Sequence, residues 1–174
     1  MHSTRIPVLG FVAASGTGKT TLLTELIPEL NLHGLRLAVI KHSHHNFEVD
    51  RQGKDSYRFR EAGADTVVLI SPFRRAIITE FSGTIEPNLE AEITALQHRQ
   101  LDIILVEGFK QSRYPKLELH RQSLKQPMLY PHDPDIIGVA SDTLLELPVH
   151  LALLDINDKN ECVKFVLQFI KSFN

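Results

Sequence analysis

Residues 13–21 read Ala-Ala-Ser-Gly-Thr-Gly-Lys-Thr-Thr, and this stretch decides the fold. An apolar run over residues 8–12 precedes it, and apolar residues at helical spacing over 22–27 follow it. A strand, a glycine-rich turn, Lys-Thr and a helix together are typical of a phosphate-binding loop. Glycines let the backbone wrap closely around phosphate, and the helix start offers free N–H groups and a partial positive charge.

The loop is therefore predicted to bind a nucleotide through Ser15, Gly16, Thr17, Gly18, Lys19, Thr20 and Thr21. Lys19 is expected to reach the β and γ phosphates and to act in catalysis, and Thr20 to face Mg²⁺. One position departs from the pattern G-x-x-x-x-G-K-[ST], because Ala13 stands where the pattern has glycine. A methyl group costs little there if the backbone needs no positive φ. The alternative reading is a glycine-rich turn that binds nothing.

Length, composition and charge limit the classes of protein to which the chain can belong. The chain has 174 residues, 43% of them hydrophobic, and a formal charge of −2, which describes an ordinary globular protein. This charge gives no reason to expect nucleic acid or an anionic membrane as a partner. Cys162 is the only cysteine, so no internal disulfide forms. No apolar run reaches about 18 residues and no signal peptide is evident, so we expect one cytoplasmic domain over residues 1–174.

Apolar runs alternate with helical patterns along the chain. The expected strands span residues 5–12, 36–40, 66–70, 74–81, 101–106, 116–120, 136–140 and 149–154. The expected helices span residues 19–33, 55–61, 89–98 and 157–173. Pro28 predicts a kink or a break in the first helix. Asp55 and Ser56 are expected to cap the second helix, and Gly63 to close it.

This order predicts an α/β fold of the P-loop NTPase type, with a mostly parallel sheet covered by helices on both faces. The strands over 66–81 are joined by Ser-Pro-Phe and predict an antiparallel hairpin beside that sheet. Residues 116–120 alternate Leu117 and Leu119 with polar residues, which suggests an edge strand. Ligands in such folds bind at the carboxyl ends of the strands. The polar motifs below follow strand ends.

Glu107 ends the expected strand over 101–106 and is predicted to hold Mg²⁺ together with Thr20. Asp102 lies at the opposite end of that strand and is left out. Asp50, in the loop after residue 45, is expected to join the Mg²⁺ shell or to orient a water in catalysis. Single carboxylates at these places are also common as solvated side chains.

The stretch from Lys41 to Lys54 holds further candidate contacts. Arg51 and Lys54 are possible charge stabilisers for the leaving phosphates. His42, His44 and His45, with Lys41, are expected to contact a phosphorylated ligand or a protein partner. A Zn²⁺ or Ni²⁺ site on the histidines is the less favoured alternative, because neighbouring residues in an extended stretch are poorly placed to share one ion and no cysteine lies near.

Asp142 follows the expected strand over 136–140 and is the candidate for base recognition. A carboxylate accepts from the N1 and N2 groups of guanine, a pairing that adenine cannot match. The usual Asn/Thr-Lys-x-Asp pattern is absent, and Ser-Asp is also a common helix cap.

Several stretches together resemble one family. They are Gly16 to Thr21, Lys41 to His45, Phe47, Asp50, Gly53 to Ser56, Ala62 to Ala64, and Val106 to Lys110. In combination they look like the molybdopterin-guanine dinucleotide biosynthesis adaptor family (MobB), and the resemblance spans about residues 6–142.

This resemblance implies a homodimeric protein that binds GTP and Mg²⁺ and hydrolyses GTP weakly. It implies an adaptor role beside the nucleotidyltransferase that joins GMP to molybdopterin, with a molybdopterin-type ligand as a further possible contact. Slow turnover fits the residues, because no second arginine finger or water-positioning glutamine is identifiable.

Two other functions remain open at this stage. A small-molecule or nucleotide kinase would need a mobile arginine-bearing lid, for which residues 111–121 are the candidate. A metal-delivering GTPase would bind Ni²⁺ or Zn²⁺ on the histidines.

Overall fold

The computed structural model describes residues 6–43, 47–97 and 99–173. The chain forms two compact units, one of Met1–His42 with Asn88–Asn174 and one of Ser43–Pro87, which are described separately here. The expectation of one domain over residues 1–174 stays a prediction. Across the described ranges, no helix combines the length and the apolar character needed to cross a membrane.

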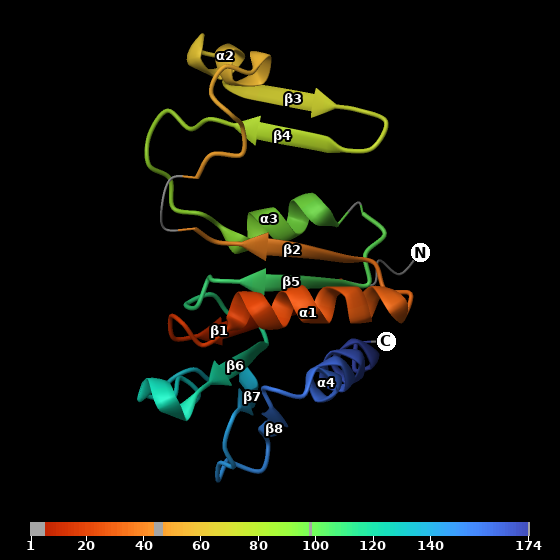
Figure 1. The fold of residues 1–174 in the computed structure, drawn as a ribbon, viewed down its shortest axis with the longest axis vertical. Helices are drawn as coiled ribbons and strands as arrows, with labels where there is room; N and C mark the ends of the chain where they lie inside the picture. The colour runs from red at the N-terminus through yellow and green to blue at the C-terminus, as the bar shows by residue number, and fades with distance from the viewer. Residues whose placement is uncertain (1–5, 44–46, 98, 174) are drawn as a thin grey trace. The chain divides into compact units, whose positions relative to one another are not determined.

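The larger unit is built on a six-stranded sheet in the order β2-β5-β1-β6-β7-β8, and every neighbouring pair is parallel (Figure 1). Its strands are β1 Val8–Ala13, β2 Leu37–Lys41, β5 Ile103–Glu107, β6 Lys116–His120, β7 Ile136–Ser141 and β8 Ala152–Asp155. All six strands therefore end at the same edge of the sheet, where ligands of such folds bind.

Helices cover both faces of this sheet, which confirms the predicted fold class. Helices α1 (Lys19–Leu32) and α4 (Lys159–Lys171) contact each other and pack on the face that carries Leu9 and Phe11. Helix α3 (Leu89–Leu96) packs with Ile104 and Val106 on the opposite face. Adjacent residues of a strand point to opposite faces, so the continuous apolar runs fill two cores.

Helix α1 continues through Pro28 to Leu32, so the expected break does not occur. Pro28 is exposed, whereas Leu22, Leu26 and Leu30 are buried against the sheet. Tertiary packing of this apolar face holds the helix together despite the missing backbone donor.

The prediction that residues 116–120 form an edge strand is wrong, because β6 pairs with both β1 and β7. Two of its polar residues, Lys116 and Glu118, are buried as deeply as its leucines. Lys116, 1% exposed, donates to Asp133 Oδ2 at 2.8 Å. The carboxylate of Glu118 accepts from the backbone N–H groups of Leu129 (2.7 Å) and Tyr130 (2.8 Å). Polar residues that alternate with leucines along a strand indicate a solvent-exposed face only where they have no buried partners. In β6, Lys116 and Glu118 both have such partners.

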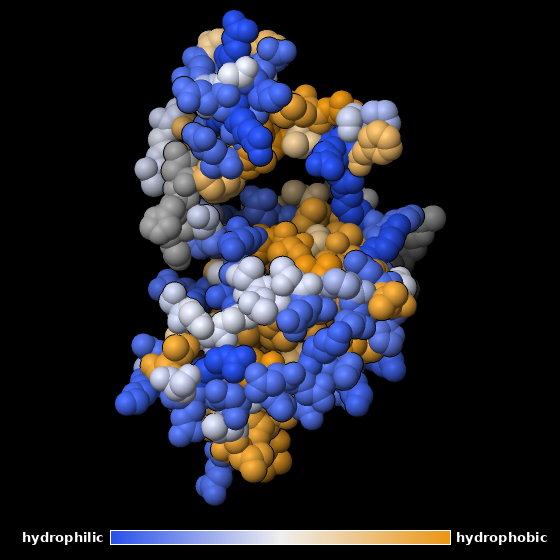
Figure 2. Space-filling model, in the orientation of Figure 1, coloured by the Kyte–Doolittle hydropathy of each residue, from blue (hydrophilic) through white to orange (hydrophobic). Residues whose placement is uncertain are grey.

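The smaller unit contains α2 (Asp55–Glu61) and an antiparallel hairpin of β3 (Thr66–Ile70) and β4 (Arg75–Thr79), as predicted. Lys54 is the N-cap of α2 and no side chain caps it, so the expected cap at Asp55 and Ser56 is wrong. Gly63 follows the helix with φ 99° and closes it. Apolar side chains lie exposed over this hairpin (Figure 2), among them Val68, Ile70 and Ile77.

Candidate nucleotide-binding site

The glycine-rich loop lies between β1 and α1 at the carboxyl edge of the sheet. Gly16 (φ 80°) and Gly18 (φ 95°) adopt left-handed backbone conformations, which L-residues with a Cβ disfavour. Ala13 is the buried last residue of β1, and its φ is not positive. Alanine therefore fits the place where the general pattern has glycine.

Among the described residues of α1 and its N-cap, no side chain places a negative charge at the N-terminus of the helix. Gly18 is its N-cap without a side-chain hydrogen bond, and no acidic residue lies in the first turn. In contrast, Asn88 caps α3 and Asp158 caps α4 through their side chains. The first N–H groups of a helix lack intrahelical partners, so those of α1 are available to a bound anion.

Glu107, the last residue of β5, lies beside two of the predicted site residues, Lys19 and Thr20. Its Oε1 lies 3.7 Å from Lys19 Nζ and accepts from the Thr20 hydroxyl at 3.4 Å. Its Oε2 lies 3.3 Å from Nζ of Lys41, the last residue of β2. A carboxylate and a hydroxyl are oxygen ligands of the type that Mg²⁺ prefers. The Thr20 hydroxyl and the Glu107 carboxylate therefore fit the binding of a magnesium ion that also contacts a phosphate.

The turn after Glu107 is held from two sides. Gly108 has φ 99°, and a Cβ built on it would lie 2.7 Å from His42 Cβ. The His42 backbone N–H donates to the Glu107 carbonyl at 2.8 Å, and its ring stacks on Phe109 with centroids 4.7 Å apart. Tyr114 donates to the Gly108 carbonyl at 2.8 Å. These contacts fix the strand end that carries the acid.

Asp142 follows β7 at the same edge of the sheet. Its Oδ1 accepts from the Gln122 backbone N–H at 3.0 Å, and its Oδ2 lies 3.8 Å from Arg121 Nη1. Arg121 also donates through Nε to the carbonyl of Thr17 at 3.1 Å. Thr17 is itself buried and donates to the Ala14 carbonyl at 2.8 Å. The phosphate loop and the candidate base residue are thus linked through one side chain.

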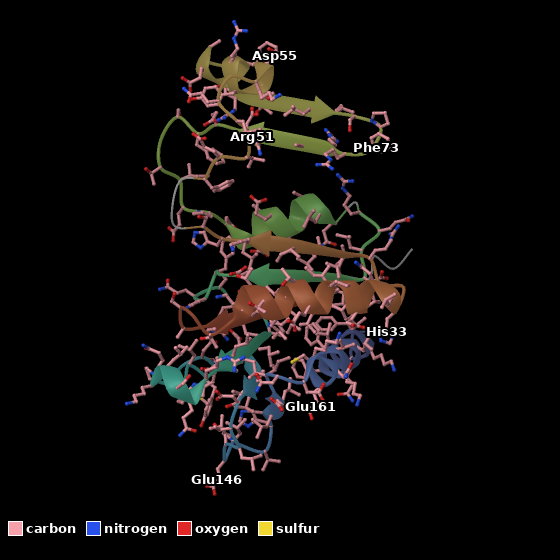
Figure 3. The ribbon with its side chains drawn as sticks, in the orientation of Figure 1. His33, Arg51, Asp55, Phe73, Glu146 and Glu161 are labelled. Carbon is pink, nitrogen blue, oxygen red and sulfur yellow. The ribbon has the colours of Figure 1, made fainter. Side chains whose placement is uncertain are left out.

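Asp50, Arg51 and Lys54 (Figure 3 labels Arg51) belong to the smaller unit, so their predicted roles at the phosphate and Mg²⁺ site stay predictions. Asp50 Oδ1 accepts from the Arg51 backbone N–H at 2.9 Å. The pKa of Arg60 is raised, first by its hydrogen bond to Glu80 and also by the charge of Asp50. The Asp50 carboxylate therefore has a cation close by within its own unit.

Of the three histidines His42, His44 and His45, the structure describes His42. His44 and His45 lie outside the described residues, so their expected contacts have no structural outcome. Within the part of the chain that the structure covers, no group of three or more His, Cys, Asp or Glu side chains is placed to hold a metal ion.

From the sequence, Arg121 is considered as the last residue of a mobile lid over residues 111–121. The structure contradicts that lid, because residues 116–120 form a central strand and Arg121 is anchored to Thr17. The signal that could have found it is the rule used for Glu107, since Arg121 directly follows the carboxyl end of a strand. Because β6 was predicted to be an edge strand, Arg121 was not assigned to the ligand-binding edge of the sheet.

A parallel sheet with a glycine-rich loop between its first strand and first helix defines the class of P-loop-type α/β proteins. The sequence model of the family MobB, Molybdopterin guanine dinucleotide synthesis protein B, matches residues 8–142. The molybdopterin-guanine dinucleotide biosynthesis adapter protein of Escherichia coli is 44% identical over 98% of this chain and 97% of its own length. The protein of the same description from Haemophilus influenzae is 42% identical over 98% and 93%. The chain therefore belongs to the MobB family.

Solved structures agree with this fold. The crystal structure of Bacillus subtilis MobB superposes with a TM-score of 0.74 at 24% identity, covering 94% of this chain and 98% of that one. A MobB homologue from Bacillus stearothermophilus gives a TM-score of 0.69 at 22% identity, covering 95% and 98%.

Proposed function

We propose that this MobB-family protein is an adapter in molybdopterin guanine dinucleotide biosynthesis that binds GTP and Mg²⁺ at its glycine-rich loop. The observation that carries the proposal is the meeting of Lys19, Thr20 and Glu107 beside the uncapped N-terminus of α1. Phosphates are held by loop and helix N–H groups and by Lys19. Thr20 and Glu107 would hold the magnesium ion, which supplies charge neutralisation of the phosphates.

Hydrolysis at this site is expected to be slow. Arg121 contacts the phosphate loop but is held by the Thr17 carbonyl and by the charge of Asp142, rather than free to approach a γ phosphate. An arginine that stabilises transition-state charge accounts for a large part of fast hydrolysis in related classes. A weak GTPase that holds its nucleotide suits an assembly role.

The proposal includes protein partners and a location in the cytoplasm. A homodimer is supported by the exposed apolar face of the β3–β4 hairpin, where Val68 opposes Ile77 across the strands. Two-stranded hairpins are marginally stable alone, which favours a covered face. The nucleotidyltransferase that attaches GMP to molybdopterin is the proposed functional partner. Lys41 and His42, beside Glu107, are candidates to meet a phosphate of a molybdopterin-type ligand.

Calorimetric titration of GTP and ATP, with Mg²⁺ and with EDTA, tests the nucleotide proposal. GTP is expected to bind more tightly than ATP and more tightly with Mg²⁺. Lys19→Ala should abolish measurable binding, whereas Lys159→Ala, which removes an exposed lysine paired with Glu29, should leave it unchanged. Binding that survives Lys19→Ala would exclude the loop as the phosphate site. Transfer of labelled γ-phosphate from GTP to a pterin or nucleoside acceptor would instead support a kinase.

A further inference from the structure

Arg121 joins four loops at the carboxyl edge of the sheet. It follows β6, donates through Nε to the carbonyl of Thr17 in the loop after β1, and lies beside Asp142 after β7. Its Nη2 also donates to Asn157 Oδ1, in the connection between β8 and α4, at 3.1 Å. A guanidinium is planar and rigid, so these acceptors are held in a fixed arrangement around it.

The contact with Arg121 fixes which way the amide of Asn157 points. A guanidinium has donors and no acceptor, so the oxygen of Asn157 faces it and the NH₂ group is left to donate elsewhere. Asn157 is exposed, so a ligand can reach this donor. The side chain is therefore presented as a hydrogen-bond donor at the edge of the sheet.

Asp142 presents the complementary chemistry. Its carboxylate is held by the Gln122 backbone N–H at 3.0 Å and by the charge of Arg121. Each carboxylate oxygen has two acceptor positions, so capacity remains for a ligand. Guanine offers an acceptor at O6 and donors at N1 and N2, whereas adenine carries a donor at its 6-position. A donor beside a carboxylate matches guanine and mismatches adenine.

We propose that Asp142 and Asn157 together form a guanine-recognition subsite, and that Arg121 is the positioning residue that ties this subsite to the phosphate loop. Asn157 donates to O6, and Asp142 accepts from N1–H and N2–H. Arg121 sets the orientation of both side chains and, through Thr17, their distance from the phosphates. This inference rests on the proposed GTP binding and adds the residues that select the base.

Affinities for GTP, ITP, ATP and inorganic triphosphate test the subsite. ITP keeps O6 and lacks the N2 amino group, ATP lacks O6, and triphosphate reports the phosphate loop alone. Asn157→Ala should weaken GTP and ITP alike by about tenfold, the loss expected for one hydrogen bond, and leave ATP unchanged. Asp142→Ala should weaken GTP more than ITP, because the contact to N2 is lost only for GTP.

Arg121→Ala should lower the GTP-to-ATP affinity ratio by about tenfold while triphosphate binding stays within about threefold. Because Arg121 acts through the other two residues, its effect on that ratio should vanish in the Asp142→Ala, Asn157→Ala background. Arg121→Lys should not rescue, since an ammonium lacks the planar fork that donates to Thr17 and Asn157 at once while its charge lies beside Asp142. Arg36→Ala is the matched control, because it removes an arginine bond to Gln100 at the opposite end of the sheet. Thermal unfolding checks that each variant is folded.

Several results would overturn the inference. Equal losses for GTP, ATP and triphosphate in Arg121→Ala would assign that residue to the phosphates. Additive effects in the triple variant would show that it does not act through Asp142 and Asn157. GTP binding that depends on Lys19 but is unaffected by Asn157→Ala would remove the subsite and leave the proposed function standing. No GTP binding by the unmodified chain would remove both.

Discussion

The hydroxyl of Thr20 lies 3.4 Å from Oε1 of Glu107, although 87 positions separate the two residues in the chain. Thr20 lies in the first turn of the helix after β1 and Glu107 ends β5, and these strands are neighbours in the sheet. Because β1 and β5 run parallel, their carboxyl ends meet at one edge. The pairing places a helix N-terminus, a hydroxyl and a carboxylate together.

Glu107→Gln is expected to remove the magnesium dependence of GTP binding. An amide keeps the size of the side chain and loses the negative charge that a divalent cation needs. GTP affinity in Mg²⁺ should fall by about tenfold or more, the effect of losing a charged contact, while affinity in EDTA should not fall. Glu25→Gln, an exposed residue on α1, serves as the control. An unchanged Mg²⁺ dependence would show that Glu107 is not near the ion.

Gly108→Ala should destabilise the protein more than Gly34→Ala does. Both positions have positive φ, 99° and 78°, and each substitution costs about 1–2 kcal/mol for that conformation. Only Gly108 is also crowded, since its added Cβ would lie 2.7 Å from His42 Cβ, whereas nothing lies within 4 Å at Gly34. The extra loss should be about 1–3 kcal/mol in urea unfolding. Equal losses of unfolding free energy in the two variants would mean that the turn around His42 shifts to accommodate the added Cβ at little cost.

Glu118→Gln should cost about 1–3 kcal/mol of unfolding free energy at neutral pH. Both carboxylate oxygens accept backbone N–H groups, from Leu129 and Tyr130. An amide has one oxygen, so its NH₂ group would face one of these donors and leave it unpaired. Glu146→Gln, at an exposed loop residue, should change little. Equal stability of the two variants in urea would contradict the bonding of Glu118.

The stability that Glu118 contributes should also depend on pH. Burial is the largest influence on this carboxyl and raises its pKa, against the lowering effect of its two backbone hydrogen bonds. A raised pKa in the folded state means that the folded protein holds the proton more tightly than the unfolded chain. Stability relative to Glu118→Gln should therefore fall as pH rises from the unfolded pKa through the folded pKa. Urea unfolding of both proteins across that range measures the difference.

Cys162 should react with a thiol reagent only after the protein opens. The residue is fully buried on α4, and burial raises the pKa of its thiol to about 12, so little thiolate forms. Labelling by a disulfide reagent should be slow in the native protein and rapid in denaturant. Saturating GTP and Mg²⁺ should slow labelling further, because a ligand bound to the folded state lowers the open population. Rapid native labelling would contradict the burial of this residue.

Much of the fold follows from local patterns. The glycine-rich loop, the hairpin and the parallel strands were predictable because each depends on residues within a few positions of one another. The meeting of Thr20 and Glu107 followed from one further rule, that parallel strands share a carboxyl edge. The predicted role of Asp50 in the Mg²⁺ site stays a prediction, because its loop belongs to the smaller unit.

By itself, the sequence determined a P-loop-type α/β protein with its phosphate loop over residues 13–21 and an acid at Glu107. The tertiary structure decided that β6 is central, because Asp133, Leu129 and Tyr130 supply the partners that bury Lys116 and Glu118. It also decided that Arg121 joins Thr17 to Asn157, across 104 and 36 positions of the chain. Local patterns mark which side chains are polar, but burial of a polar group depends on partners that only the folded chain brings to it.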